Sequence, residues 1–300
     1  MKSKIAAWFL GIFLFVANPV KGIAQTEPVV LGRAVERLQV GKLLHRDDFD
    51  SLERWVVQIE EKDGFPEPKV AIENGTLDCR LPGRGCTIWY KQKLKNRLAI
   101  TYEVVCPKLE AGSKSFLPRD VNNFWLASDP VDPVSGLFDA ERYDGDFISY
   151  HKMNGYYAST GGGKNTTTRM RRYPREKEEL PAKHVALNDR DGKSEYMISP
   201  GKTLRVQLVA FDDLIQYIVD GKLVYEIAYG DDVATEKVLD RRKKQQGNER
   251  YDAETFPFYQ EGFFGFRMVG THHIYSKFRV YQLEPAEQSG HQSDPTPEAK

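Results

Sequence analysis

The stretch KTLRVQLVAFDDLIQYIVDGKLVYEIAY, residues 202 to 229, limits the folds open to this chain more than any other. Polar and apolar side chains alternate from Thr203 to Leu208, which is the period of a strand with one buried face. Asp220 and Gly221 then separate two apolar runs. This pair suits a type I′ turn, because both of its central residues take positive φ. The stretch therefore predicts a strand followed by a β-hairpin.

Similar strand segments, separated by turns, occupy most of the chain. They include KVAIENGTLDCRL with its Asn-Gly turn, TIWY, LAITYEVVC, GFFGFRMVG and HIYSKFRVYQL. The best helix candidate, residues 232–254, is highly charged and predicts a surface helix or a mobile loop. This pattern predicts an all-β, antiparallel β-sandwich or jelly roll over residues 43–284. A lead-in segment, 25–42, would precede it, and a disordered polar tail, 285–300, would follow.

The N-terminus has the features of a signal peptide over residues 1–24. Lys2 and Lys4 precede the apolar run IAAWFLGIFLFVA, and small residues then lead to Ala24. We predict cleavage between Ala24 and Gln25, hence an exported, periplasmic or extracellular protein with no stable membrane span after cleavage. A retained membrane anchor is the weaker alternative, because the apolar run is short and Pro19 follows it.

An oxidising compartment changes how the cysteines are interpreted. Cys79 and Cys86 flank the turn-rich stretch RLPGRG and could close a hairpin disulfide. The alternative is three free, partly buried thiols, with Cys106 as the third. The sequence leaves both open.

The charge balance argues against one class of partner but not against a bound metal ion. The chain carries 43 basic and 43 acidic residues, a balance that argues against nucleic acid as a partner. No cofactor is required and no metal ligands are assigned. Exposed aspartate pairs, Asp212–Asp213 and Asp231–Asp232, could hold a structural calcium ion, although such pairs are more often solvated turns.

Three stretches carry a family resemblance. DDFDSLERWVVQ opens the first, which continues through IENGTLDCRL and TIWYKQKLKNRLAITYEV; LRVQLVAFDDLIQYIVDGKLVYEI and GFFGFRMVGTHHIYSKFRVYQL are the other two. In this order they resemble the concanavalin A-like lectin/glucanase superfamily, including a secreted bacterial branch of unknown function. The resemblance implies a jelly roll of two curved sheets whose concave face binds glycans. Lectins, glycoside hydrolases and polysaccharide lyases share that fold.

Residues 143–174, YDGDFISYHKMNGYYASTGGGKNTTTRMRRYP, do not have the composition of a scaffold. DFISYHKM alternates, which predicts a strand with Phe147, Ser149 and His151 on one face. TTTRMRRYP would place Arg169 and Arg171 on one side and Arg172 on the other. A solvated charged hairpin is the alternative. Amide, aromatic and basic side chains suit a polar ligand, and the predicted substrate-binding residues are Asn122, Asn123, Trp125, Asn165, Arg169, Arg171, Arg267 and His272.

Trp125 could stack against a sugar ring or be an ordinary core residue, and the sequence leaves these equal. The terminal stretch RMVGTHHIYS would join the site through Arg267 and one of the adjacent histidines, since His272 and His273 point to opposite faces of a strand.

The predicted chemistry is β-elimination on an acidic polysaccharide. The predicted catalytic residues, His151, Tyr156 and Tyr157, would transfer protons, and an arginine would hold the uronate carboxylate. The glucanase motif Glu-x-Asp-x-x-Glu is absent, so a glycoside hydrolase using Asp144 or Asp146 is an alternative. A non-catalytic carbohydrate-binding protein is the other.

Overall fold

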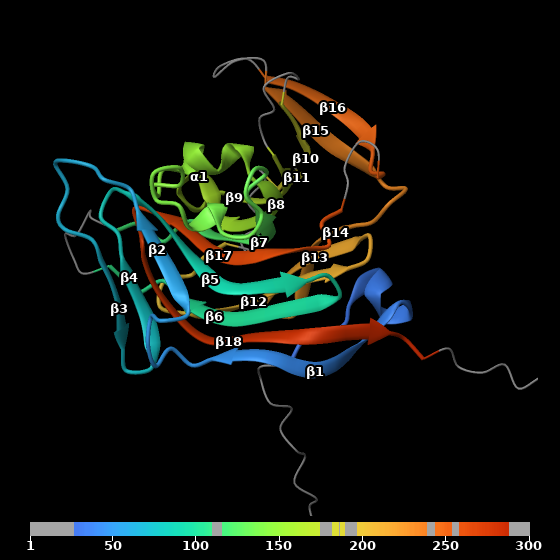
Figure 1. Cartoon of the computed structure of the whole chain (residues 1–300), viewed down its shortest axis with the longest axis horizontal. Helices are drawn as coiled ribbons and strands as arrows, with labels where there is room; N and C mark the ends of the chain where they lie inside the picture. Colours follow the sequence, from blue (N-terminus) through green and yellow to red (C-terminus); the bar gives the residue numbers. More distant parts are fainter. Residues whose placement is uncertain are drawn as a thin grey trace, which may run out of the picture.

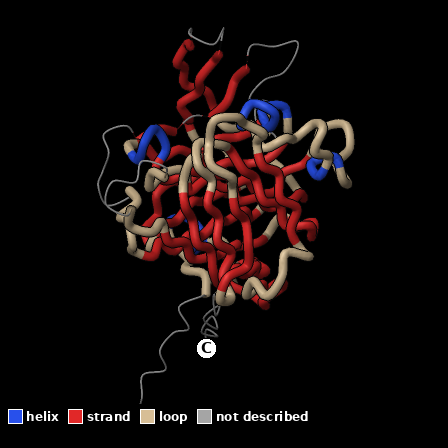
Figure 2. Tube along the Cα trace, turned by 90° about the vertical axis from the view of Figure 1, so that its left-hand side faces the viewer, coloured by secondary structure: helices blue, strands red, loops and turns tan. Residues whose placement is uncertain are grey.

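The computed structural model describes residues 27–109, 116–174, 182–185, 187–189, 197–238, 244–253 and 258–287. The expected signal peptide, its cleavage site and residues 288–300 of the expected tail lie outside them. Two antiparallel β-sheets pack face to face, and a small third sheet projects from one end (Figure 1). Strands form nearly all of the sandwich, and the short helical turns lie at its periphery (Figure 2). The predicted antiparallel sandwich is therefore confirmed.

The larger sheet has eight strands in the order β14-β13-β12-β6-β18-β4-β3, with β1 pairing beside β4 on the same edge of β18. Their bounds are β1 Leu38–Asp47, β3 Lys69–Glu73, β4 Thr76–Arg80, β6 Leu98–Val105, β12 Thr203–Phe211, β13 Leu214–Val219, β14 Lys222–Ile227 and β18 His272–Pro285. The predicted hairpin is confirmed: Asp220 and Gly221 have φ of 50° and 72°. The Asn74-Gly75 turn between β3 and β4 also has two positive φ angles, 52° and 69°.

The second sheet has seven strands in the order β11-β9-β8-β7-β17-β5-β2. Their bounds are β2 Trp55–Ile59, β5 Gly85–Lys95, β7 Val121–Ser128, β8 Asn154–Gly161, β9 Thr167–Tyr173, β11 Leu187–Asp189 and β17 Glu261–Val269. The remaining elements are the small sheet, with β10 Ala182–Val185, β15 Asp232–Val238 and β16 Lys244–Arg250, and the short helices η1 Gly32–Glu36, η2 Gly136–Phe138, η3 Phe147–Lys152 and α1 Gly162–Asn165.

The main core lies between the two large sheets, because alternate residues of nearly every strand point inward. Leu204, Val206 and Leu208 are all buried there, whereas Thr203 and Arg205 on the same strand are exposed. Aromatic rings fill much of this layer: Trp55 stacks on Phe266 at 5.3 Å between ring centroids. The alternation read from residues 203–208 is thus confirmed.

Two further apolar clusters cover the outer faces of the sandwich. On the eight-stranded sheet, the N-terminal segment and η1 pack Leu31 and Ala34 against Val209 and Ile218. On the seven-stranded sheet, residues 129–153, here called the covering segment, pack Leu137 and Tyr150 against Trp89 and Phe124. Both large sheets are therefore partly buried on their outer faces as well.

Three sequence-based expectations were wrong. Residues 232–238 and 244–250 form strands rather than a helix or a mobile loop, because β15 pairs with β10 on one edge and β16 on the other. The first strand begins at Leu38 inside the expected lead-in, where it pairs with β18. Residues 147–152 form the 3₁₀ helix η3, with the Asp146 side chain accepting from the Ile148 amide at its start.

The cysteines follow the second of the two interpretations. Cys79, Cys86 and Cys106 are free and buried. Burial raises the pKa of the Cys86 thiol to about 12, although the charge of Arg267 opposes this shift. Such thiols stay protonated near neutral pH and behave as small apolar side chains.

Candidate functional site

Strand alternation divides the predicted site residues between the two faces of the seven-stranded sheet. Asn123, Trp125 and Tyr156 point inward, toward the eight-stranded sheet. Asn123 accepts a hydrogen bond from the Tyr102 hydroxyl on β6, and Trp125 packs on Tyr156 at 5.3 Å between ring centroids. Both rings are fully buried. The expectations that Asn123 and Trp125 bind substrate and that Tyr156 is catalytic were wrong, because the inter-sheet core covers all three.

The outer face of the same sheet brings together other predicted residues from four strands. In the strand registers, Arg267 on β17 lies opposite Asn122 on β7, Asn122 lies opposite Ser159 on β8, and Ser159 lies opposite Arg169 on β9. Two residues along β8 and β9, and therefore on the same face, Tyr157 lies opposite Arg171. We call these six residues the outer polar cluster: Asn122, Tyr157, Ser159, Arg169, Arg171 and Arg267.

Arg267 lies on β17, more than ninety positions along the chain from the other members of the cluster. The stretch RMVG supplied it, and the antiparallel pairing of β17 with β7 places it beside Asn122. His272 does not follow it into the cluster. It lies on β18 of the other sheet, where its Nε2 is 3.2 Å from Asp78 Oδ2. The expectation for His272 was therefore wrong.

The covering segment lies over the seven-stranded sheet (Figure 1), and side-chain hydrogen bonds hold it there. Gln58 on β2 donates to the Leu137 carbonyl and accepts from both the Trp89 indole and the Tyr150 hydroxyl, at 2.8–2.9 Å. Arg267 Nη1 donates to the Gly145 carbonyl at 2.8 Å. The contacts of the Leu137 carbonyl, the Tyr150 hydroxyl and the Gly145 carbonyl join the segment to side chains of the sheet, so the segment has a defined position.

His151 reaches the edge of the cluster from this segment. It lies in η3, where its ring is 5.2 Å from the ring of Phe147. Phe147 is in turn 6.0 Å from Tyr157 and 5.5 Å from the Arg267 guanidinium. The structure therefore gathers His151, Tyr157 and Arg267 around one phenyl ring, although the strand predicted for residues 147–151 is a helix.

The cluster carries more positive than negative charge. Asp120, immediately before β7, is an acidic group on which the nearby arginines act electrostatically. Burial raises the pKa of Asp120 above its ordinary value, although nearby cations oppose this shift: Arg119, Arg267 and Arg169. Burial also raises the pKa of Tyr157 to about 12, despite the Arg171 guanidinium 5.6 Å from its ring. Tyr157 is therefore protonated near neutral pH.

Several polar atoms of the cluster have no hydrogen-bond partner among the described residues. They include Arg267 Nε, Arg171 Nε and Asn122 Oδ1, on side chains that are 1%, 4% and 4% exposed. A buried donor without an acceptor costs about 1–3 kcal/mol, more when it is charged. Arg119 and Asp120 are about one-fifth exposed, at 21% and 19%, so the cluster reaches the surface at this end.

Other predicted residues have local roles. Asn165 accepts from the Ile198 amide and donates to its carbonyl at 2.9 Å each, so it fixes two chain segments together. The expectation that it binds substrate was wrong for that reason. Asp144 and Asp146 each accept from a backbone amide two residues ahead, which is the geometry of an Asx turn.

The aspartate pairs proposed for calcium face arginines in this structure. Asp213 pairs with Arg37, and Asp231 pairs with Arg33 at 2.6 Å. Among the described residues, no group of three or more His, Cys, Asp or Glu side chains is placed to hold a metal ion.

Sequence reasoning missed several residues of the site. Alternation along GYYAST would have placed Ser159 on the same face as Tyr157. Asp120 carries a weaker signal, as the acidic residue two positions before Asn122. The roles of Phe147 and Tyr150 depend on how the covering segment folds back, and no local pattern encodes that.

Comparison with known protein families identifies the family of this chain. The family model described as "Domain of unknown function (DUF6250)" matches residues 82–238. The chain belongs to the DUF6250 family. The matched part of this DUF6250 protein contains β7, β8 and β9 and hence five members of the outer polar cluster, whereas Arg267 lies beyond it.

Solved structures similar to this DUF6250 protein share low identity with it. One is a protein of unknown function with a galectin-like fold from Bacillus subtilis: 13% identity, 82% of this chain and 98% of that chain covered, TM-score 0.49. Another is the endo-beta-1,3-glucanase from Pyrococcus furiosus: 10% identity, 84% and 99% covered, TM-score 0.46. A third is carbohydrate binding module CBM66 from Bacillus subtilis: 11% identity, 76% and 96% covered, TM-score 0.42. Similarity at this level does not bear on activity.

None of the curated proteins compared with the chain matches it. Within the described ranges, no helix is both long enough and apolar enough to span a membrane.

Proposed function

We propose that this protein binds an acidic polysaccharide at the outer polar cluster. The observation that carries the proposal is the pair of nearly buried guanidinium groups of Arg171 and Arg267, whose Nε atoms have no acceptor among the described residues. Buried charges are normally paired. Here one carboxyl, Asp120, faces several arginines, so an external anion would complete the arrangement.

The neighbouring groups favour a sugar acid over a simple anion. Asn122, Ser159 and Tyr157 supply amide and hydroxyl groups between the arginines, and such groups exchange hydrogen bonds with sugar hydroxyls. A planar guanidinium binds a carboxylate or sulfate through two parallel hydrogen bonds. The partly exposed end at Arg119 and Asp120 gives such a group a way in.

A binding measurement with one conservative variant tests this proposal. Titration calorimetry against uronate-bearing and sulfated oligosaccharides should show binding that weakens as salt rises. Arg171→Lys keeps the charge but loses the planar fork, and we expect about tenfold weaker binding. Arg97→Lys, at an exposed arginine paired with Asp212, is the matched control and should leave binding unchanged. Equal affinity of wild type and Arg171→Lys would refute the site.

Cleavage by β-elimination is the second candidate, favoured by His151 and Tyr157 lying against the same ring beside the arginines. His151 would remove the C5 proton of a uronate, the C4–O bond would break, and Tyr157 would protonate the leaving oxygen. The raised pKa of Tyr157 keeps its hydroxyl protonated near neutral pH, so it holds the proton that this step requires. A hydrolase using Asp144 or Asp146 has less support, because both carboxylates hold local turns.

Product analysis separates cleavage from binding. A lyase creates an unsaturated uronate with ultraviolet absorbance, a hydrolase creates reducing ends without it, and a binding protein creates neither. His151→Ala should abolish the absorbance signal while acidic-glycan affinity is kept. Unchanged turnover in a folded His151→Ala protein would remove His151 from the chemistry.

A further inference from the structure

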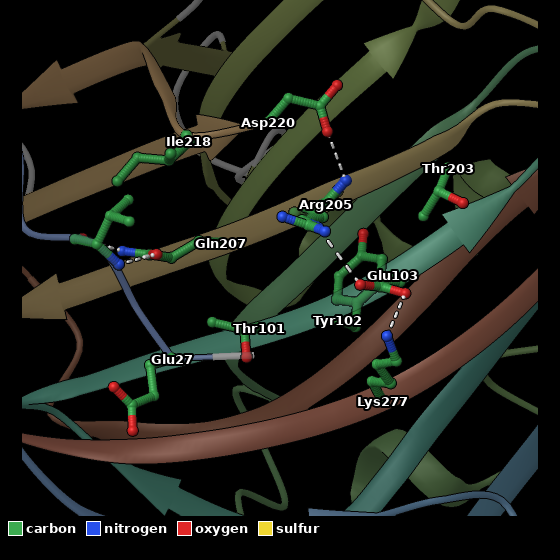
Figure 3. A pocket seen from close by; sticks show the side chains of 13 residues that line it. Glu27, Thr101, Tyr102, Glu103, Thr203, Arg205, Gln207, Ile218, Asp220 and Lys277 are labelled. Carbon is green, nitrogen blue, oxygen red and sulfur yellow. Dashed lines mark hydrogen bonds and ion pairs between the residues drawn. The ribbon is translucent and has the colours of Figure 1, made fainter. Parts of the chain in front are cut away.

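A pocket lies on the outer face of the eight-stranded sheet, the sheet that does not carry the outer polar cluster (Figure 3). Its volume is about 440 Å³, which is within the usual range of small-ligand sites. Strands β6, β12 and β18 form its floor, the N-terminal segment at Val29 forms one wall, and the hairpin tip at Asp220 forms the rim. None of the outer polar cluster lines it.

A glutamine side chain of the sheet holds the wall of this pocket at Val29. Gln207 on β12 accepts from the Val29 amide at 2.8 Å and donates to the Val29 carbonyl at 2.7 Å. This is the pairing that another strand would make, so Gln207 holds the N-terminal segment as a neighbouring backbone would. Gln207 lies opposite Thr101, and Arg205 lies opposite Glu103, in the β12–β6 register. The pocket is therefore formed before any ligand arrives.

Three charged side chains meet at its centre (Figure 3). Glu103 lies 3.4 Å from Arg205 Nε through one carboxylate oxygen and 3.0 Å from Lys277 Nζ through the other. Glu103 is 14% exposed, whereas Arg205 and Lys277 are 46% and 43% exposed. Positive, negative and positive groups thus alternate across an open surface.

Lys277 has an unfavourable backbone conformation. Its φ is 56°, and the β18–β6 register shifts between Ser276 and Arg279. This β-bulge lets both Tyr275 and Phe278 face the core despite their spacing. Packing therefore accounts for the bulge, but glycine is the residue that favours such a position, and another residue costs about 1 kcal/mol there. The lysine side chain itself is explained by its reach to Glu103.

We infer that this pocket binds a unit of an uncharged glycan. Its charged lining residues are two cations, Arg205 and Lys277, and three anions, so an anionic ligand gains no net attraction: Glu27, Glu103 and Asp220. A sugar hydroxyl can donate to the Glu103 carboxylate and accept from an adjacent cation. Val29, which is exposed, adds apolar surface for the ring. The inference is independent of the acidic-glycan site, which uses other residues on the opposite sheet.

Two substitutions test this inference. Titration calorimetry against uncharged gluco-, xylo- and manno-oligosaccharides should show binding by the wild-type protein. Lys277→Gly should weaken it about tenfold, through the loss of a charge-assisted hydrogen bond, while thermal stability stays unchanged or rises because glycine suits the bulge. A purely structural lysine would give the opposite stability result. Glu103→Gln should weaken the same binding.

The control is Arg171→Lys, which should leave uncharged-glycan binding intact while it weakens acidic-glycan binding. The inference is overturned if no uncharged oligosaccharide on the panel binds, if Lys277→Gly and Glu103→Gln bind as wild type does, or if Arg171→Lys abolishes this binding. The first two outcomes do not affect acidic-glycan binding at the outer polar cluster. A failure of this inference is therefore distinguishable from a failure of the proposed function.

Discussion

The two outer faces of the sandwich carry similar charged side chains in opposite settings. On the seven-stranded sheet, Arg171 and Arg267 are nearly buried and keep Nε atoms without acceptors among the described residues. On the eight-stranded sheet, Arg205 and Lys277 are close to half exposed and share Glu103. Charges in the first setting depend strongly on any partner that arrives, whereas charges in the second are already paired and solvated. The covering of each face therefore determines whether its charged side chains are buried or solvated.

The largest effect should come from detaching the covering segment. Gly145 has a φ of 91°, and a Cβ there would meet the Glu60 amide nitrogen at 2.3 Å. Gly145→Ala should lower the free energy of unfolding by about 3 kcal/mol or more, since backbone atoms cannot move aside easily. Thermal or urea unfolding measures this loss. The substitution should also weaken acidic-glycan binding, because Arg267 Nη1 loses its contact with the Gly145 carbonyl.

Gly64→Ala is the matched control for backbone conformation. Gly64 also has a positive φ, 79°, but its Cβ would meet nothing within 4 Å. We expect a loss of about 1 kcal/mol there. If both variants lost the same stability, close packing of the covering segment would not be the cause, and the contrast between the two faces would weaken.

A smaller effect should follow from Asp129, which anchors the start of the covering segment. Burial alone would raise the pKa of Asp129, but hydrogen bonds from the Tyr143 hydroxyl and two backbone amides lower it overall. Asp129→Asn should therefore cost about 2 kcal/mol near neutral pH. Because the folded pKa is depressed, this stabilisation is present above the unfolded value and is lost as pH falls through the folded value.

Hydrogen exchange resolved along the chain should locate that loss in residues 129–153. The difference between wild type and Asp129→Asn should shrink in acid. Asp139→Asn, at an exposed aspartate of the same segment, should change exchange little. Uniformly faster exchange in both sheets would show instead that the segment and the sandwich unfold as one unit.

The smallest effect should come from the open face. Glu103→Gln removes the charge between Arg205 and Lys277, yet exposed ion pairs contribute at most about 1 kcal/mol. We expect the melting temperature to change little, with a salt dependence no greater than that of wild type. A large destabilisation would show that this trio holds the sheet together and would erase the contrast with the outer polar cluster.

Much of the fold could be predicted from local patterns. The two hairpin turns, the alternation in β12 and the opposite placement of Arg171 and Arg172 on β9 follow from period-two strands and positive-φ turn pairs. The prediction for residues 232–238 and 244–250 was wrong because their charges suggested a helix, whereas β15 pairs with both β10 and β16 and all three are strands. For η3, the alternation of DFISYHKM resembled a strand, but the Asp146 cap and packing against the sheet favour a helix.

The sequence by itself determined which residues of a strand share a face; the tertiary structure decided which face holds the site. Asn122 and Asn123 had to point to opposite sides of β7, yet nothing local showed which would meet the core. The reason is that both faces of this sheet are covered, one by the other sheet and one by residues 129–153, so buried aromatic side chains occur on both. Trp125 and Tyr157 look equally suited to a ligand in the sequence. The long-range pairing of β17 with β7 places Arg267 beside Asn122 on the outer face, which Tyr157 shares. Trp125 instead faces the core between the two sheets.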